Sequence, residues 1–141
     1  MSKISFENRV AIITGAGGAL GRGYALDIAS RGGAVVVNDL GGAVEGGAGT
    51  SQMADQVVAE IRAAGGRAVA SYDSVNTAEG AARMVRTALD NFGRVDALIN
   101  NAGNFRIGVL EESSEEDLLS LLSVHLVGSY HVSKAVWPHM K

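Results

Sequence analysis

The feature that most constrains the fold is a short apolar run that leads directly into a glycine-rich turn and then into a helix-length stretch. Residues 9–14 read R-V-A-I-I-T, and residues 14–23 read T-G-A-G-G-A-L-G-R-G. Dense β-branched residues are typical of a strand, and glycines just after a strand let the backbone turn tightly into a helix. The main-chain N–H groups at such a helix start form an anion-binding site, so this junction predicts a place for a phosphate group.

Similar apolar runs alternate with helix-length amphipathic stretches along the rest of the chain. With the run at 9–14, we expect strands at residues 34–38, 67–72 and 95–100. We expect helices from the glycine turn to about residue 31, at 51–64, at 78–92 and from 114 onward, with Ser114 and Asp117 as a capping box. Almost wholly apolar strands that alternate with helices indicate a parallel sheet covered on both faces. The sequence therefore predicts an α/β, Rossmann-type, doubly wound parallel sheet, as one domain over residues 1–141.

The composition is that of an ordinary globular protein, and it excludes several kinds of partner. Of the 141 residues, 47% are hydrophobic and 19% charged, and the formal net charge is -3. A negative chain does not neutralise phosphates, so we expect no nucleic acid, and no apolar run is long enough to span a membrane. Without cysteine there is no thiolate metal site, and we expect no metal. The first residues lack an apolar signal segment, so we expect an intracellular protein.

The glycine turn and an acidic residue beyond it together indicate a dinucleotide site. Asp39 ends the second predicted strand, where its carboxylate would accept both hydroxyls of an adenosine ribose and repel a 2′-phosphate. We therefore predict NAD as the cofactor. The candidate contacts from the turn and from this strand end are Gly15, Gly17, Gly18, Ala19, Leu20, Gly21, Asp39 and Leu40. A tight turn packed on its helix, and a carboxylate that merely caps a loop, remain the alternatives.

Several motifs along the chain resemble those of the short-chain dehydrogenase/reductase family. Thr14, Gly15 and Gly21 match the family's Thr-Gly-x-x-x-Gly-x-Gly turn, and Asp73 matches the aspartate that ends its third strand. Residues 100–103 match its Asn-Asn-Ala-Gly motif in full. The runs V-V-V-N-D-L-G-G, Y-D-S-V and V-H-L-x-G-S, with the glycine-rich insertion at 41–49, are similar to one branch. That branch is the (3R)-hydroxyacyl-CoA dehydrogenase domain of peroxisomal-type multifunctional enzymes and their bacterial relatives.

The resemblance implies a fold, a reaction and further contacts. It implies the strand order 3-2-1-4, and hydride transfer between nicotinamide and a secondary alcohol or ketone carbon, with a 3-hydroxyacyl-CoA as the substrate. It implies a cytoplasmic location in a bacterium and a peroxisomal one in a eukaryote. It also implies that the helix after residue 114 contributes to a dimer interface. The cofactor contacts that it adds are Asp73, Ser74, Asn101, Ala102 and Gly103.

Two positions depart from the family pattern. Ala19 stands where the family has its middle glycine, so we expect its methyl group to crowd a pyrophosphate. His125 stands where the family has the asparagine of its catalytic tetrad, and the V-H-L-x-G-S pattern makes histidine a trait of the branch. His125 is therefore the one catalytic candidate. Its spacing from Leu118, Leu122 and Val132 places it on an apolar helix face, where a histidine is more often structural.

Tyr130 and Lys134 lie one helical turn apart and have the family's Tyr-x-x-x-Lys spacing. In the family this pair follows a fifth strand that ends in a catalytic serine. The residues before Tyr130, E-E-D-L-L-S-L-L-S-V-H-L-V, have the period of a helix instead. We therefore interpret the pair as a chance match, with Tyr130 half-buried beside Leu126 and Trp137 and Lys134 in solvent.

Three hypotheses about function follow. We favour the cofactor-binding half of an NAD-dependent hydroxyacyl dehydrogenase without the catalytic serine, tyrosine and lysine or the C-terminal strands, so that residues 1–141 alone would show no turnover. The second is a non-catalytic nucleotide-binding module. The third is an interaction module whose sheet edge a partner completes, because the run V-D-A-L-I-N at 95–100 would form an uncovered edge strand. We also expect a homo-oligomer or a strand-completing partner.

Overall fold

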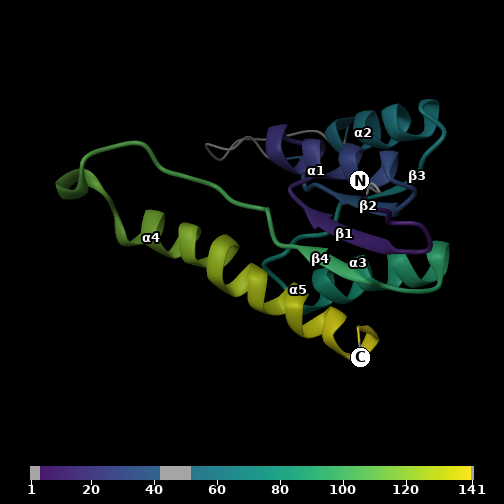
Figure 1. Ribbon diagram of the computed structural model, residues 1–141. Helices are drawn as coiled ribbons and strands as arrows, with labels where there is room; N and C mark the ends of the chain where they lie inside the picture. Colours follow the sequence, from purple (N-terminus) through teal and green to yellow (C-terminus); the bar gives the residue numbers. More distant parts are fainter. Residues whose placement is uncertain (1–3, 42–51, 141) are drawn as a thin grey trace.

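Four parallel strands form the sheet of the computed structural model, which describes residues 4–41 and 52–140 (Figure 1). The strands are β1 Val10–Thr14, β2 Ala34–Asn38, β3 Arg67–Ser71 and β4 Ala97–Ile99. Their order in the sheet is β3-β2-β1-β4, which confirms the predicted order 3-2-1-4. Most of the glycine-rich insertion predicted at 41–49 lies outside the described residues.

Helices cover both faces of this sheet, as expected for a doubly wound fold. On one face lie α1 Ala19–Ser30 and α2 Gln52–Ala63, and on the other lie α3 Ala78–Phe92 and α5 Ser129–Val136. Side chains of β1 alternate between the two cores: Ile13 packs toward α1 and α2, and Ile12 packs toward α3 and α5. Both are completely buried, which explains why the strands are apolar on both faces.

β4 is shorter than the strand predicted at 95–100, because side chains replace ladder hydrogen bonds at both of its ends. Before the strand, Asp96 Oδ2 accepts the Val10 N–H at 2.8 Å. After it, the Thr14 hydroxyl accepts the N–H of Asn101 and of Ala102, each at 3.0 Å. The flanking residues are therefore held by β1 without belonging to the ladder.

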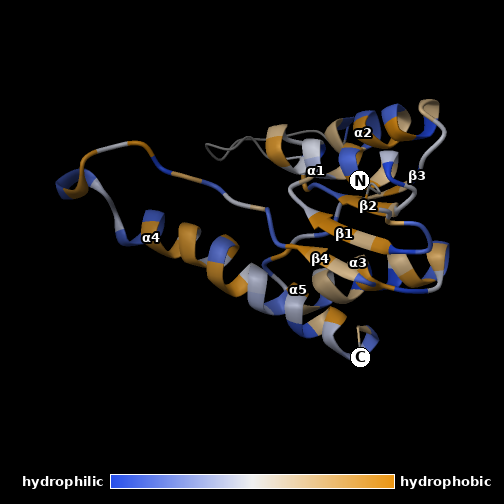
Figure 2. Cartoon of the chain, viewed as in Figure 1, coloured by the Kyte–Doolittle hydropathy of each residue, from blue (hydrophilic) through white to orange (hydrophobic). Residues whose placement is uncertain are grey.

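The helical stretch after residue 114 is a rod of several segments that leaves the body of the molecule (Figure 1). A short 3-10 turn, Leu110–Glu112, precedes α4 Glu115–Leu122, and the π-helical turn Ser123–Gly128 joins α4 to α5. A 3-10 turn, Trp137–His139, follows α5. The predicted capping box of Ser114 and Asp117 at the start of α4 is confirmed. Hydrophobic residues are visible along α4, away from the sheet (Figure 2), and no helix of the described residues is long and apolar enough to cross a membrane.

The π-helical turn overturns the apolar face predicted for Leu118, Leu122, His125 and Val132. Val132 is fully buried, whereas Leu118 and Leu122 are 54% and 41% exposed and His125 is exposed as well. A π-turn closes its hydrogen bonds from i to i+5, so the 3.6-residue period does not continue through it. Residues before and after the turn therefore do not share one face.

Candidate cofactor-binding site

A cavity of about 550 Å³ opens at the carboxyl ends of the strands, where ligands bind in open α/β sheets. Most of the residues predicted to contact a cofactor line it: Gly15, Gly18, Ala19, Leu20, Gly21, Asp39, Leu40, Asp73, Ser74, Asn101, Ala102 and Gly103. Gly17 and His125 are not among the lining residues. The parallel sheet thus brings together four segments that are far apart in the sequence.

The glycine turn lies tightly against the loop after β4, and two of its glycines make that possible. Gly15 has a φ of +64°, and a Cβ there would lie 2.9 Å from the Ala102 Cα. A Cβ on Gly21 would lie 2.4 Å from the Gly15 carbonyl oxygen and 2.6 Å from the Asn101 Nδ2. Gly18 caps α1 without a side-chain hydrogen bond. Because Gly18 and Ala19 line the cavity, the positive end of α1 faces it.

The Asp39 carboxylate is held in place at the end of β2 by two main-chain donors. Its Oδ2 accepts the Gly17 N–H at 2.9 Å, and its Oδ1 accepts the Gly41 N–H at 2.8 Å. A Cβ on Gly17 would lie 2.8 Å from Oδ2, so a side chain there would displace the carboxylate. Gly17 therefore acts on the cavity through Asp39 and does not line it.

Thr14 and Asn101 lock the glycine turn to the loop after β4. Besides its two acceptor bonds, the Thr14 hydroxyl donates to the Ile99 carbonyl at 3.4 Å. The Asn101 side chain donates to the carbonyl oxygens of Thr14 at 2.9 Å and Gly15 at 3.0 Å. Asn101 thus stabilises the turn through these two hydrogen bonds, in addition to lining the cavity.

Asp73 lies in a polar network that sequence reasoning did not predict beyond Asp73 itself. Its Oδ2 accepts from the Ser71 hydroxyl at 3.0 Å, and its Oδ1 accepts from the Arg83 guanidinium at 2.5 Å. The Asn38 side chain donates to the Asp73 carbonyl at 2.9 Å. Asn38 and Ser71 are buried polar residues that follow apolar runs at the ends of their strands, and that is the signal by which the sequence could have indicated them.

His125 lies on the π-helical turn and binds the loop after β4. Its Nε2 is 2.7 Å from the Asn104 carbonyl oxygen and 3.3 Å from the Asn104 nitrogen. A Cβ on Gly103 would lie 2.7 Å from the His125 Cε1, so glycine is what lets the ring approach. In this arrangement the imidazole orients the main chain next to the cavity.

Tyr130 and Lys134 lie on α5, away from the cavity lining. The Lys134 ammonium is 5.5 Å from the centroid of the Tyr130 ring, a cation–π contact with the ring face. Tyr130 is 57% exposed, close to the predicted half-burial, and Leu126 and Trp137 are themselves 64% and 65% exposed.

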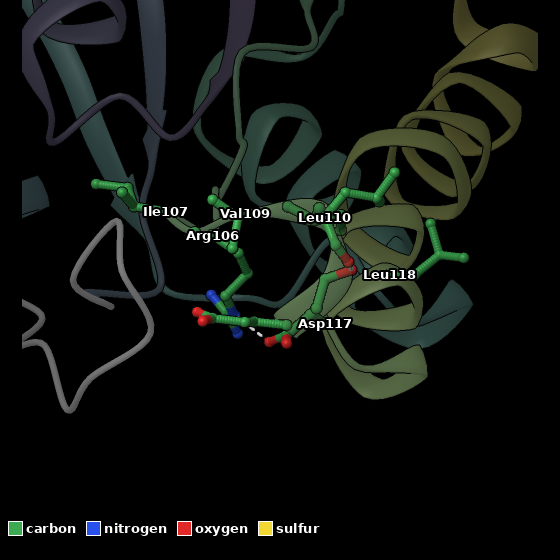
Figure 3. Close-up of a pocket in the computed structure, with 10 residues that line it drawn as sticks. Arg106, Ile107, Val109, Leu110, Asp117 and Leu118 are labelled. Carbon is green, nitrogen blue, oxygen red and sulfur yellow. Dashed lines mark hydrogen bonds and ion pairs between the residues drawn. The ribbon is translucent and has the colours of Figure 1, made fainter.

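A second hollow of about 500 Å³ lies between the segment before α4 and α4 itself (Figure 3). Arg106 donates to the Asp117 carboxylate at 3.0 Å, and Ile107, Val109, Leu110 and Leu118 are among the other lining residues. Hydrogen bonds from Ser114, aided by Arg106, lower the pKa of Asp117 below its ordinary value. None of these residues was a predicted contact.

The fold and the cavity together define a nucleotide-binding α/β protein: a parallel sheet in the order 3-2-1-4, a glycine turn at a helix start, and a carboxylate at the end of β2. The chain belongs to the short-chain dehydrogenase family, whose model matches residues 9–141. This confirms the family predicted from the motifs.

Named relatives place the chain more closely. It is 56% identical over 135 residues to a Mycobacterium tuberculosis protein named as a short-chain type dehydrogenase/reductase, covering 96% of this chain and 47% of that protein. It is 53% identical over 138 residues to the peroxisomal hydratase-dehydrogenase-epimerase of Saccharomyces cerevisiae, covering 98% of this chain and 15% of that enzyme. The chain thus spans at most about half the length of these relatives.

A solved structure shares the fold closely. A short chain dehydrogenase/reductase from Burkholderia phymatum, in complex with NAD, matches with a TM-score of 0.86 at 31% identity. The match covers 98% of this chain and 46% of that structure's chain.

Proposed function

We propose that residues 1–141 form the NAD-binding half of an oxidoreductase that transfers hydride between nicotinamide and a secondary alcohol or ketone carbon. The observation that carries the proposal is the Asp39 carboxylate, held at the end of β2 by the N–H groups of Gly17 and Gly41. A fixed carboxylate there accepts ribose hydroxyls and repels a 2′-phosphate, which favours NAD over NADP.

The residues of the cavity suit each part of this cofactor. Gly15 and Gly21 leave no side chain between the turn and the loop after β4, and the start of α1 offers free N–H groups to a pyrophosphate. Asp39 takes the adenosine ribose and Asp73 the adenine. Bound nicotinamide supplies the hydride chemistry, while the protein holds and orients it. His125 supports the loop around Asn104 as a positioning residue in this scheme.

The substrate and the location follow from the relatives by analogy. The yeast relative is named as a peroxisomal hydratase-dehydrogenase-epimerase, and a mouse relative, 52% identical, as a peroxisomal multifunctional enzyme. Together with the motif resemblance to hydroxyacyl-CoA dehydrogenase domains, these names support a 3-hydroxyacyl-CoA as the substrate of the whole protein, and a location that is cytoplasmic in a bacterium or peroxisomal in a eukaryote. We expect no turnover from residues 1–141 alone, because no tyrosine or lysine is among the described residues that line the cavity.

One observation favours the third hypothesis, a module whose sheet edge is completed by a partner or by another copy. Among the described residues β4 pairs with β1 alone, and all three of its residues are only partly buried. An incompletely covered edge strand is a template for another strand. A stable stoichiometric complex in which the partner adds a strand beside β4 would support this candidate.

The test is a parallel titration of the chain with NADH and NADPH, followed by nicotinamide fluorescence. We expect tighter binding of NADH by about tenfold or more, the value of a hydrogen bond to a charged group. Asp39→Asn should weaken NADH binding and bring the two dissociation constants close together. The matched control, Asp27→Asn, removes an exposed helix carboxylate that pairs with Arg31. Binding of neither nucleotide, or equal binding of both, would overturn the proposal.

A further inference from the structure

Three polar residues are buried in the described part of the chain, and they form a row across the sheet. Thr14, Asn38 and Ser71 are 1%, 2% and 3% exposed. Each is the last residue of its strand, and the strand register pairs Thr14 with Asn38 and Asn38 with Ser71. Burial of a polar group costs free energy unless it is hydrogen-bonded, and each of these three side chains is hydrogen-bonded.

Asn38 is the centre of the row and joins three segments of the cavity wall. Its carbonyl oxygen accepts the Ala16 N–H of the glycine turn at 2.8 Å. Its Nδ2 donates to the Ser71 carbonyl at 3.3 Å, the Ser71 hydroxyl at 3.2 Å and the Asp73 carbonyl at 2.9 Å. Its main chain continues directly into Asp39. One buried amide therefore fixes the turn, the end of β2 and the segment after β3 relative to one another.

Ser71 passes this constraint on to the Asp73 carboxylate. The Ser71 hydroxyl accepts from Asn38 and donates to the Asp73 Oδ2 at 3.0 Å, so its single proton has a defined direction. The Asp73 Oδ1 accepts from Arg83, whose exposed side chain approaches from α3. The hydroxyl and the guanidinium hold the two carboxylate oxygens, and the amide holds the main chain of Asp73, so the carboxylate keeps one orientation at the cavity.

We propose that Asn38 and Ser71 are positioning residues that set Asp73 to recognise the 6-amino group of adenine. This inference rests on the proposed function, because it takes the bound nucleotide to be NAD. A carboxylate accepts hydrogen bonds from an amino group and repels an oxygen in the same place. An oriented carboxylate discriminates adenine from hypoxanthine, which carries a carbonyl oxygen at that position, whereas a carboxylate free to rotate away discriminates much less.

The test compares the dissociation constants of NADH and reduced nicotinamide hypoxanthine dinucleotide, which differ at the purine. The proteins are the unchanged chain, Ser71→Ala, Asn38→Leu and the control Asn91→Leu. Asn91 is an exposed residue on α3 whose amide donates to the Thr87 carbonyl within the helix. The ratio of the two constants is the readout, because a smaller folded fraction weakens both ligands equally and cancels.

We expect the unchanged chain and Asn91→Leu to prefer NADH by about tenfold, the value of one hydrogen bond to a charged group. In Ser71→Ala and Asn38→Leu the preference should fall to about threefold or less. If Asn38→Leu does not fold, Ser71→Ala decides the question, since it removes one oxygen without changing the shape of the core. An unchanged preference in Ser71→Ala would overturn the inference.

A failure of the inference is distinguishable from a failure of the proposed function. If the unchanged chain binds NADH but shows no preference over the hypoxanthine analogue, the positioning role is wrong and NAD binding stands. If the unchanged chain binds neither dinucleotide, the proposed function is wrong, and the inference falls with it.

Discussion

At the scale of single residues, the glycines of α1 differ sharply in what a side chain would meet. A Cβ on Gly21 would lie 2.4 Å from the Gly15 carbonyl oxygen, against main chain that cannot move aside easily. A Cβ on Gly23, two residues further along the same helix, would meet nothing within 4 Å. The same residue type therefore has a packing role at one position and none at the other.

This difference gives a matched pair of variants. Gly21→Ala should lower the free energy of unfolding by about 1–3 kcal/mol, as other overpacked sites do, and should abolish NADH binding by pushing the turn from the loop after β4. Gly23→Ala should raise stability by about 0.5–1 kcal/mol, because alanine is the better helix former. Urea unfolding and NADH titration of both variants check this. Equal effects of the two substitutions would contradict it.

At the scale of elements, the junction of β1 and β4 depends on one carboxylate. Asp96 accepts hydrogen bonds from Arg9 at 3.1 Å, from the Val10 N–H at 2.8 Å and from Arg94 at 2.6 Å. Burial by itself raises the pKa of Asp96, but the bonds from Arg94, Val10 and Arg9 outweigh it and bring the pKa below its ordinary value. The charged form is therefore the one that stabilises the junction.

The stability of the chain should consequently depend on pH through Asp96. Because its pKa is lower in the folded than in the unfolded state, its contribution is complete above the unfolded pKa of about 3.9 and is lost as pH falls through the folded pKa. Asp96→Asn should cost on the order of 1 kcal/mol at pH 7, and less at pH 3. Urea unfolding at both values measures this, with Asp27→Asn as an exposed control. An Asp96→Asn deficit that is as large at pH 3 as at pH 7 would argue against it.

At the scale of the whole molecule, the rod of α4 and the π-helical turn carries an apolar surface that no described residue covers. Leu118, Leu119, Leu122 and Leu126 are 54%, 55%, 41% and 64% exposed. α4 itself buries no residue. A cluster of exposed leucines of this kind is typical of a surface that associates with another protein surface.

The chain should therefore self-associate, and the associated fraction should rise with its concentration. Replacing Leu118, Leu122 and Leu126 together by glutamine should weaken association at least tenfold, since each buried leucine contributes about 1.5–3 kcal/mol. The control Ile4→Gln removes an isoleucine that is 71% exposed but lies outside the rod. Sedimentation velocity over a range of concentrations measures the association of the triple variant and of the Ile4→Gln control. Association that persists in the triple variant would place the contact elsewhere, with the edge of β4 as the next candidate.

The strands, the sheet order and most cavity residues could be predicted because their signals are local or belong to a motif. The run at 9–14 and the glycines after it specify a strand, a turn and a helix within one stretch of chain. The prediction of one apolar face along the helix after residue 114 was wrong, because the π-turn interrupts the α-helical period. An α-helical period assumes that every hydrogen bond runs from i to i+4, and nothing in the letters around His125 signals the wider turn.

The sequence by itself determined the parallel α/β sheet, the glycine turn and the position of Asp39 at a strand end, because periodicity and chain order fix them. Only the tertiary structure decided which polar groups meet. The bonds from Asn38 to Ser71 and Asp73, and from the Val10 N–H to Asp96, join residues that lie far apart in the chain. They exist because the register of neighbouring strands places those residues side by side, and register belongs to the packed sheet and not to any one segment.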